Sequence, residues 1–333
     1  MNAPQSTLPT VLQRFFCEYL IQQRHLSPHT VASYRDTFRL FLSFLQARLT
    51  RQPSCLRLED LNGQNVSAFL DDCEGGRGNT PRTRNVRLAA IHSFLRFALR
   101  CEPESLVQLQ AAMAIPFKKC VKPVLGYLTP EETAAILNAP GSSRWSDRRD
   151  RMLFATMYNT GSRVSEIIAA RVSDLSGNGT GRLTLHGKGR KERIVPLMKQ
   201  TTRMLREWVR DNELTAQSPL LPNARGTPMT RSAVEKRLAK TLMAAAENCP
   251  SLRGKKVTPH TIRHTTAMHL LQSGVDIAVI ALWLGHEDMS TTHVYMTSDI
   301  QMKERALNAL QEPAGKRGRF RPSDKLLRFL DGL

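Results

Sequence analysis

The sequence lacks the hydrophobic length that a membrane-spanning protein needs. Its longest uninterrupted apolar run covers only eight residues, Ile277 to Leu284, whereas a transmembrane helix needs about 20. The N-terminal stretch MNAPQSTLPT also lacks the basic and then apolar pattern of a secretion signal. We therefore expect a cytoplasmic protein that has no membrane partner.

Cysteine is sparse, and its spacing disfavours a metal site. The six cysteines form no Cys-x-x-Cys pair and stand at no spacing typical of metal ligands. No cluster of His, Asp and Glu has such spacing either, which disfavours a metal-dependent nuclease. We expect isolated reduced thiols, no bound metal and no cofactor. The cysteines are Cys17, Cys55, Cys73, Cys101, Cys120 and Cys249.

Negative charge is also in short supply. The chain has 48 Lys and Arg against 29 Asp and Glu, a formal net charge of +19. Such an excess predicts a polyanionic partner, and the lack of a strongly amphipathic basic helix favours nucleic acid over an anionic membrane surface. Residues 1–117 contain 13 Arg, no Lys and 9 acids, a net of +4, whereas residues 118–333 carry 35 basic residues against 20 acids, a net of +15. The Arg-only section fits contact with phosphates and guanine edges, but a GC-rich genome that favours Arg codons explains it equally.

Helical periodicity dominates the first section of the chain. Ser27-Pro28 is a typical helix start, since Ser can cap and Pro suits the first turn, and apolar residues follow at helical spacing as far as Leu45. A short acidic helix is expected around 62–73, and another helix opens at Thr80-Pro81. The last helix has an inward side of Val86, Ala90, Phe94, Leu95 and Ala98, and a basic side that is either solvated or in contact with DNA: Arg82, Arg84, Arg87 and Arg96.

A linker at residues 118–128 is expected to join a helical domain, residues 1–117, to a second domain at 129–311. The stretch 112–127 has two prolines, a Lys pair and no clear period, and Thr129 to Glu132 then reads as a capping box. A basic and then apolar tail follows at 312–333. In the second domain we expect a hairpin of strands 183–186 and 193–195, with its turn at Gly187-Lys188-Gly189. The helices expected in this part of the chain lie near 129–138, 147–160, 162–170, 199–213, 230–247, 259–273, 276–284, 290–297 and 299–310.

Four segments supply the residue types that phosphodiester cleavage without a metal would need. A nucleophile must attack phosphorus, fixed cations must meet the charge on the non-bridging oxygens, and an acid and a base must move protons. Arg suits the phosphate because its fork donates two parallel hydrogen bonds. His260 and Arg263 share one face of an expected helix. The segments are TGSRVSE at 160–166, HGKGRKER at 186–193, PHTIRH at 259–264, and LGH at 284–286 with Tyr295 nine residues beyond His286.

In this order the segments resemble the phage integrase family, the tyrosine recombinases, and the resemblance covers essentially the whole chain. It implies a mainly α fold with a small antiparallel β-sheet, in which a helical core-binding domain precedes a catalytic domain. It implies a site-specific recombinase that cleaves and rejoins double-stranded DNA through a 3′-phosphotyrosyl intermediate and a Holliday junction. The implied assembly is a homo-tetramer on DNA that contains a specific recombination site. Within the cytoplasm, the protein is therefore expected to associate with the nucleoid.

The resemblance also implies a role for each residue of the site. Residues 264–287 resemble members associated with transposons and other mobile elements, so integration, excision or transposition is the expected task, and other recombinases or accessory proteins stay open as partners. Glu166 matches an acidic support of the site. The catalytic residues implied are Tyr295 as nucleophile, Arg163 and Arg263 as the phosphate clamp, Lys188 as general acid, His260 as general base, and His286 as a hydrogen-bond donor to a non-bridging oxygen.

The sequence leaves DNA contacts and two rival functions open. Met296-Thr297 stand where many relatives have one residue and then His, so the fine positioning of Tyr295 is open. One rival is a DNA-binding protein with a dead site, which the intact set of six residues argues against. The other is a type IB topoisomerase-like enzyme with identical chemistry. Besides the four arginines of the helix that begins at Thr80-Pro81, the residues expected to contact DNA are Arg190, Lys191 and Arg231.

Overall fold

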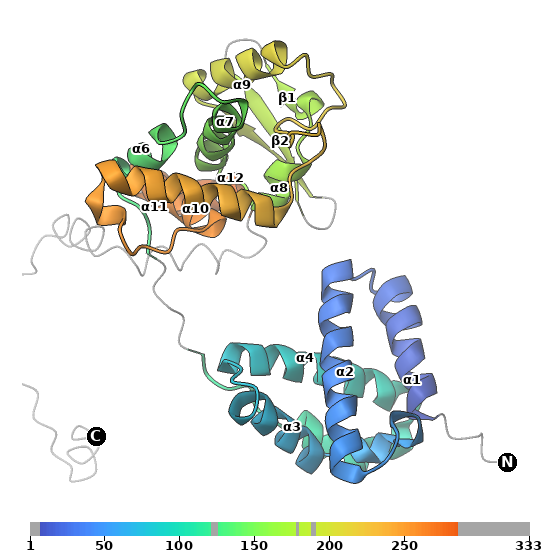
Figure 1. The fold of residues 1–333 in the computed structure, drawn as a ribbon. Helices are drawn as coiled ribbons and strands as arrows, with labels where there is room; N and C mark the ends of the chain where they lie inside the picture. Colours follow the sequence, from blue (N-terminus) through green and yellow to red (C-terminus); the bar gives the residue numbers. More distant parts are fainter. Residues whose placement is uncertain (1–6, 121–125, 178–179, 188–190, 286–333) are drawn as a thin grey trace, which may run out of the picture. The chain divides into compact units, whose positions relative to one another are not determined.

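The computed structural model describes residues 7–120, 126–177, 180–187 and 191–285. Its contacts divide the chain into two compact units, residues 1–123 and 124–333 (Figure 1). The first unit is helical, and the second combines helices with one small antiparallel sheet. The expected fold class is therefore confirmed. The helices expected at 290–297 and 299–310 and the tail at 312–333 lie outside the described residues.

The first unit is built from five α-helices and one π-helical segment within the described residues. The helices at 28–49, 63–75 and 81–101 start at the positions that the sequence predicts. The periodicity does not predict the helical segments at 8–14, 15–23 and 106–113, and the last of them extends into the stretch 112–127, which has no clear period in the sequence. The elements are α1 (Leu8–Arg14), η1 (Phe15–Gln23), α2 (Pro28–Leu49), α3 (Gly63–Gly75), α4 (Pro81–Cys101) and α5 (Leu106–Met113), with 3-10 turns at Pro53–Cys55, Leu58–Leu61 and Pro103–Ser105.

Local capping explains why the helices begin where they do. The Ser27 Oγ accepts a hydrogen bond from the Thr30 N–H at 3.3 Å, and the Thr80 Oγ1 accepts one from the Thr83 N–H at 3.3 Å. Each bond satisfies one of the backbone donors that the first turn of a helix leaves unpaired. Inside the unit the helices meet over a cluster of buried aromatic rings, in which Phe94 lies 5.3 Å from Phe15, centroid to centroid.

Helix α4 corrects one prediction about DNA contact. Arg84 is buried, with 6% of its surface exposed, because it stands on the same helical stripe as the buried Leu88 and Ile91. Its Nη1 donates to the Pro116 carbonyl at 3.4 Å, and its Nε lies 3.7 Å from Glu74. Arg84 therefore fastens the end of the first unit and does not stand on the exposed basic side of α4. Val86, expected to face inward, is 47% exposed instead.

The second unit places its helices around a three-stranded antiparallel sheet of order β1-β2-β3 (Figure 1). Leu183 pairs with Val195 in the β2–β3 hairpin, as the sequence predicts, but β1 was not expected. Leu183, Leu185 and Val195 are buried in the core of the unit. The elements are α6 (Pro130–Asn138), α7 (Trp145–Thr160), α8 (Val164–Ala169), β1 (Leu175–Ser176), β2 (Arg182–His186), β3 (Glu192–Pro196), α9 (Lys199–Asp211), α10 (Arg231–Asn248), α11 (Pro259–Gln272) and α12 (Ile277–Leu284), with 3-10 turns at Val172–Asp174 and Pro250–Leu252.

Polar contacts fix α6 and α11 in the second unit. The capping box is confirmed, since the Glu132 N–H donates to the Thr129 Oγ1 at 3.2 Å and the Thr129 N–H donates to the Glu132 carboxylate at 3.1 Å. Helix α11 is held by His269, whose Nε2 donates to the Leu128 carbonyl at 2.9 Å while its Nδ1 accepts from the Tyr158 hydroxyl at 2.8 Å. Among the described residues no helix is long and apolar enough to cross a membrane.

Candidate active site

The loop between α7 and α8 begins the site, and Gly161 gives the loop its shape. Gly161 has φ +58°, a left-handed conformation that residues with a side chain rarely adopt. A Cβ atom at this position would overlap the Cδ2 of Leu284. The loop therefore lies directly against the end of α12, and it delivers Arg163 as the residue that precedes the first turn of α8.

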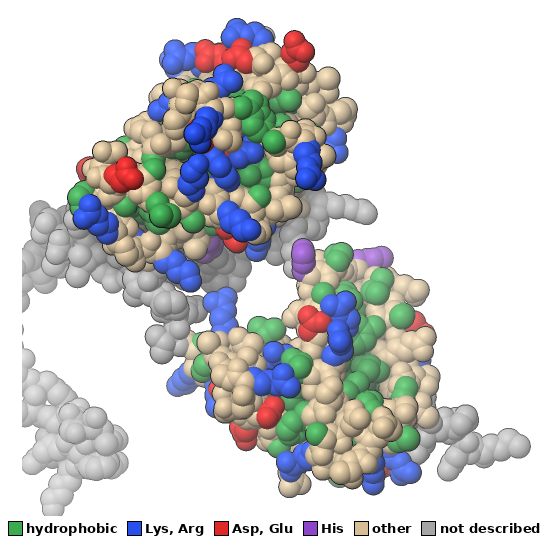
Figure 2. All heavy atoms as spheres, viewed as in Figure 1, with side chains coloured by type: hydrophobic (Ala, Val, Ile, Leu, Met, Phe, Trp, Pro, Cys, Tyr) green, Lys and Arg blue, Asp and Glu red, His purple; other side chains and the backbone are tan. Residues whose placement is uncertain are grey.

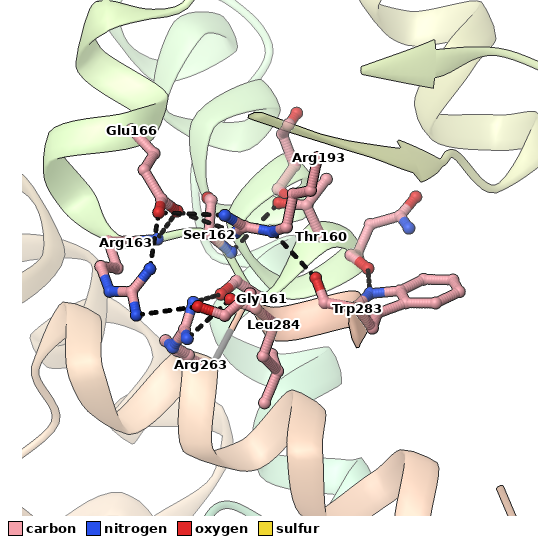
Figure 3. A network of polar contacts seen from close by, with 12 residues as sticks. Thr160, Gly161, Ser162, Arg163, Glu166, Arg193, Arg263, Trp283 and Leu284 are labelled. Atoms are coloured by element: carbon pink, nitrogen blue, oxygen red, sulfur yellow. Dashed lines mark hydrogen bonds and ion pairs between the residues drawn. The ribbon is translucent and has the colours of Figure 1, made fainter. Parts of the chain in front are cut away.

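Arg263 joins this loop to the end of α12. It comes from the second turn of α11 and is buried, with 3% of its surface exposed. Its Nη1 donates to the Gly161 carbonyl at 2.7 Å, and its Nη2 donates to the Leu284 carbonyl at 2.8 Å (Figure 3). A guanidinium is suited to this junction because its rigid fork presents two parallel donors. Arg263 thus brings together three segments that are far apart in the sequence.

Arg163 lies beside Arg263 but is more open to solvent, with 43% of its side chain exposed. Its Nη1 donates to the Glu166 carboxylate at 2.8 Å, and its Nη2 lies 3.3 Å from the Gly285 carbonyl. The structure therefore brings both predicted clamp residues to the same helix end. Their cationic groups meet where α12 ends at Leu284, two residues before His286 in the sequence.

Glu166 is the anionic centre of the cluster. Its carboxylate is buried and accepts from the Arg163 N–H at 2.8 Å, and from the Arg193 Nη1 and Nη2 at 3.0 and 2.8 Å (Figure 3). Burial alone would raise the pKa of Glu166, but the hydrogen bonds from Arg193 and from the Arg163 backbone and side chain lower it to about 2. Glu166 therefore stays ionised throughout the neutral range and holds two arginines in place.

Sequence reasoning assigned no role to Arg193. Its side chain is only 12% exposed, and besides Glu166 its Nε reaches the Trp283 carbonyl at 2.9 Å. A signal was present in the sequence, since Arg193 and the buried Val195 are two residues apart and therefore lie on the same face of β3. An Arg that shares a face with apolar neighbours requires a buried anionic partner.

His260 stands in the first turn of α11, near both clamp arginines. Desolvation of the ring lowers its pKa, and the charges of Arg263 and Arg163 lower it further, although part of the side chain reaches solvent. The imidazole is therefore neutral at pH 7 and able to accept a proton. Among the residues that the structure describes, no group of three His, Cys, Asp or Glu side chains is arranged to hold a metal ion.

Comparison with known proteins settles the family. The model of the phage integrase family matches residues 126–302, and the model of the phage integrase N-terminal SAM-like domain matches residues 13–102. This chain belongs to the phage integrase family. Its members are tyrosine recombinases, enzymes that cut one DNA strand and join it to another, and the present chain is such an enzyme.

Relatives of this recombinase extend over nearly its whole length. A putative integrase/recombinase of Sinorhizobium fredii, y4rC, is 45% identical over 98% of this chain and 99% of its own length. The tyrosine recombinase XerD of Pseudomonas putida is 31% identical over 90% of this chain and 96% of its own. The XerH recombinase bound to its difH substrate shares the fold, with a TM-score of 0.65 and 24% identity over 86% of this chain and 81% of its own.

Several expected site residues of the recombinase lie outside the described residues. These are Lys188 and Arg190 in the hairpin, and His286 and Tyr295 after α12. The base of the hairpin is described, and there the Gly187 N–H donates to the Lys191 carbonyl at 2.7 Å. The hairpin that carries the predicted general acid therefore starts next to the Arg193–Glu166 pair, because Arg193 follows two residues after Lys191 on β3.

His186 anchors the same hairpin from its other strand. Its Nε2 lies 3.1 Å from the Asp174 carboxylate and its Nδ1 lies 3.0 Å from the Glu192 carboxylate. The hydrogen bond to Asp174 raises the pKa of His186, with a smaller contribution from Glu192. The two carboxylates therefore favour the protonated form of His186 relative to a free imidazole, and that form can donate from both ring nitrogens at the start of the hairpin.

The candidate DNA-contact residues differ in exposure. Arg82, Arg96, Lys191 and Arg231 are exposed, whereas Arg87 is half-buried. Lys and Arg side chains gather on the face of the second unit that Figure 2 shows. With Arg84 removed from the set, the exposed arginines of α4 stand near its start and toward its end.

Proposed function

We propose that this recombinase acts at a specific DNA site to integrate, excise or transpose a mobile element, and that its active site comprises Arg163, Lys188, His260, Arg263, His286 and Tyr295. The observation that carries the proposal is the meeting of Arg163 and Arg263 at the end of α12, beside His260. This end leads directly to His286, and Tyr295 follows nine residues later. Two fixed guanidinium groups suit a phosphate whose charge increases during reaction.

The proposed cleavage step needs only groups of the chain and the DNA. The Tyr295 hydroxyl attacks the scissile phosphorus and loses its proton to the neutral His260. A bond forms between the tyrosine oxygen and phosphorus, and the bond from phosphorus to the 5′ oxygen breaks. Lys188 donates a proton to that leaving oxygen, while Arg163, Arg263 and His286 donate hydrogen bonds to the non-bridging oxygens. The products are a 3′-phosphotyrosyl link and a free 5′ hydroxyl, and reversal on a second strand rejoins the DNA.

Binding to double-stranded DNA is proposed to rest on charge in both a core-binding domain at 1–117 and a catalytic domain at 129–311. A net +15 on residues 118–333 favours phosphate contact. The proposed contacts are the exposed Arg82, Arg96, Lys191 and Arg231, together with the half-buried Arg87 and with Arg190, which lies outside the described residues. A homo-tetramer on two sites is the proposed assembly, and a solved lambda integrase tetramer of the same fold is bound to a Holliday junction.

The decisive experiment separates recombination from simple relaxation. Inverted repeats in the DNA that flanks the gene are tested by footprinting, and the protected sequence is placed twice on one plasmid. Exchange between the two copies is expected, with covalent protein–DNA complexes on nicked duplexes of the same sequence. Relaxation of the plasmid without exchange would favour the topoisomerase-like alternative. Binding without any covalent complex would favour the alternative with a dead site.

A further inference from the structure

We propose that Arg193 is a positioning residue whose positive charge offsets that of Glu166, so that Arg163 keeps its own charge for the scissile phosphate. The inference rests on the proposed role of Arg163 as a clamp residue. Under this proposal Arg193, on β3, affects the reaction through Arg163 and makes no contact with DNA itself. The Arg193 side chain is only 12% exposed, whereas 43% of the Arg163 side chain is exposed.

The geometry shows how Glu166 is divided between the two arginines. Arg193 binds both carboxylate oxygens, through Nη1 at 3.0 Å and Nη2 at 2.8 Å. Arg163 binds one of them with a single side-chain nitrogen, its Nη1 at 2.8 Å. Arg193 is thus the two-pronged partner of the carboxylate, whereas Arg163 gives it one side-chain donor and turns its Nη2 to the Gly285 carbonyl (Figure 3).

The charges of the three side chains explain why this division matters. Glu166 contributes −1, Arg163 contributes +1 and Arg193 contributes +1, so the group as a whole is cationic. Removal of Arg193 leaves a neutral pair in which Arg163 is the side-chain partner of a buried carboxylate. Attraction between opposite charges is strong where water is excluded, and a buried charge that loses one partner is costly. Arg163 would then be drawn toward Glu166 and away from the DNA.

A second contact keeps Arg193 in this position. Its Nε donates to the Trp283 carbonyl at 2.9 Å, so one guanidinium links β3 to the last turn of α12 while it binds Glu166. Any residue with a side chain at position 285 would press on this group, because a Cβ atom in place of a Gly285 hydrogen would lie 3.0 Å from the Arg193 Cδ. Lys cannot replace this arrangement, since its ammonium lacks the planar fork that serves three acceptors at once.

The test compares Arg193→Met, Glu166→Gln and the double variant in the full-length protein. The measured quantity is the single-turnover rate of covalent complex formation at saturating DNA. Each variant is assayed on a nicked duplex with an ordinary scissile phosphate and on one with a methylphosphonate, which has no ionised non-bridging oxygen. Arg210→Met on α9 is the matched control, since the Arg210 side chain is 76% exposed and pairs with its neighbour Asp211.

We expect Arg193→Met to lower the rate roughly 100-fold on the ordinary phosphate, comparable to losing one donor to a developing oxyanion. The loss on the methylphosphonate, relative to wild type, is expected to be at least about 10-fold smaller, because little charge is left to stabilise. Glu166→Gln in the Arg193→Met background should restore at least about 10-fold of the rate, since it removes the competing anion. Arg193→Lys should fall between wild type and Arg193→Met, and Arg210→Met should match wild type.

Two results would overturn the proposal. One is an equal loss of rate on both substrates, and the other is a double variant no faster than Arg193→Met, because either would mean that Arg193 only supports the packing. Thermal unfolding midpoints are measured for every variant, and Arg193→Gln, which is also neutral, replaces Arg193→Met in the comparison if the latter does not fold. Failure of the wild-type protein to form a covalent complex would count against the proposed function itself, which keeps the two conclusions separable.

Discussion

The Arg263 guanidinium donates to the Leu284 carbonyl at 2.8 Å, and this bond is the middle one of a series. Arg193 donates to the preceding carbonyl, that of Trp283, at 2.9 Å, and Arg163 lies 3.3 Å from the following one, that of Gly285. Three arginines from three different segments therefore hold three successive carbonyls where α12 ends. Carbonyls at this end of a helix lack backbone partners and carry the negative end of the helix dipole, so cations suit them.

The first prediction concerns the nucleophile. Tyr295→Phe removes one oxygen and should leave DNA affinity unchanged, because the charge of the protein and its phosphate contacts are the same. No covalent complex should form on a nicked duplex, as judged by the shifted band on a denaturing gel. A covalent band that persists in this variant would show that another residue is the nucleophile.

The second prediction concerns the junction that Arg263 makes. Arg263→Lys keeps the charge but cannot reach the Gly161 and Leu284 carbonyls together with the same geometry. It should lower the free energy of unfolding by about 1–3 kcal/mol, the usual cost of leaving a buried hydrogen-bonding group unpaired, and should nearly abolish cleavage. Urea denaturation and the single-turnover assay measure the two effects. The exposed Arg231→Lys is the control, and equal effects at both positions would contradict the structure.

The third prediction uses two glycines that share a conformation but differ in surroundings. Gly161 and Gly226 have φ +58° and +76°, and of the two only Gly161 lies against other side chains, those of Leu284 and, less closely, Thr266. Ala at Gly226 should cost about 1–2 kcal/mol of stability, the strain of a left-handed residue. Ala at Gly161 should cost about 1–3 kcal/mol more, because of overpacking.

A second substitution isolates the overlap at Gly161. Leu284→Ala removes the Cδ2 atom, so it should recover part of the extra loss in a double variant with Gly161→Ala. Chemical denaturation measures the free energy of unfolding of Gly226→Ala, Gly161→Ala, Leu284→Ala and the double variant, each relative to wild type. Equal costs at Gly161 and Gly226 would show that the loop does not lie against α12.

The fourth prediction concerns pH and His260. Desolvation and two nearby arginines lower the pKa of His260, and a base must be unprotonated to act. The cleavage rate should therefore rise with pH below about 6.5, the ordinary value for His, and should already be level at pH 7. His260→Asn should lose this acidic limb and roughly 100-fold or more in rate. A rate of the wild-type protein that still rises steeply between pH 7 and 8 would rule out His260 as the base.

The fifth prediction distinguishes the roles of Arg82 and Arg84, which the sequence assigned to the same basic side of α4. Arg82→Gln should weaken DNA binding and reduce the slope of log affinity against log salt by about one unit, as expected for one lost phosphate contact. Arg84→Gln should instead lower the free energy of unfolding, since Arg84 is buried beside Glu74, and should leave the salt slope unchanged. Binding titrations at several salt concentrations measure the first effect, and chemical denaturation measures the second. A reduced salt slope for Arg84→Gln would mean that this side chain reaches DNA after all.

Local interactions were readable from the sequence by itself. Ser27, Thr80 and Thr129 act on backbone groups within three residues, so each marks a helix start without help from the fold. The hairpin also follows from local alternation, and the order of the motifs was enough to indicate a tyrosine recombinase. The short β1 strand was not readable, since Leu175 and Ser176 become a strand only by pairing with β2.

The tertiary structure decided which charged residues serve the interior. Arg84 and Arg82 look alike in the sequence, but the direction of the helical stripe buries only Arg84, beside a carboxylate from another helix. Arg193 likewise gains its meaning from Glu166 and Trp283, which are 27 and 90 residues away along the chain. Burial of a charge depends on partners that arrive from distant segments, and no local pattern encodes where those segments meet. The sequence thus determined the chemistry that is available, and the packing of α7, α11, α12 and β3 determined which arginines hold the site together.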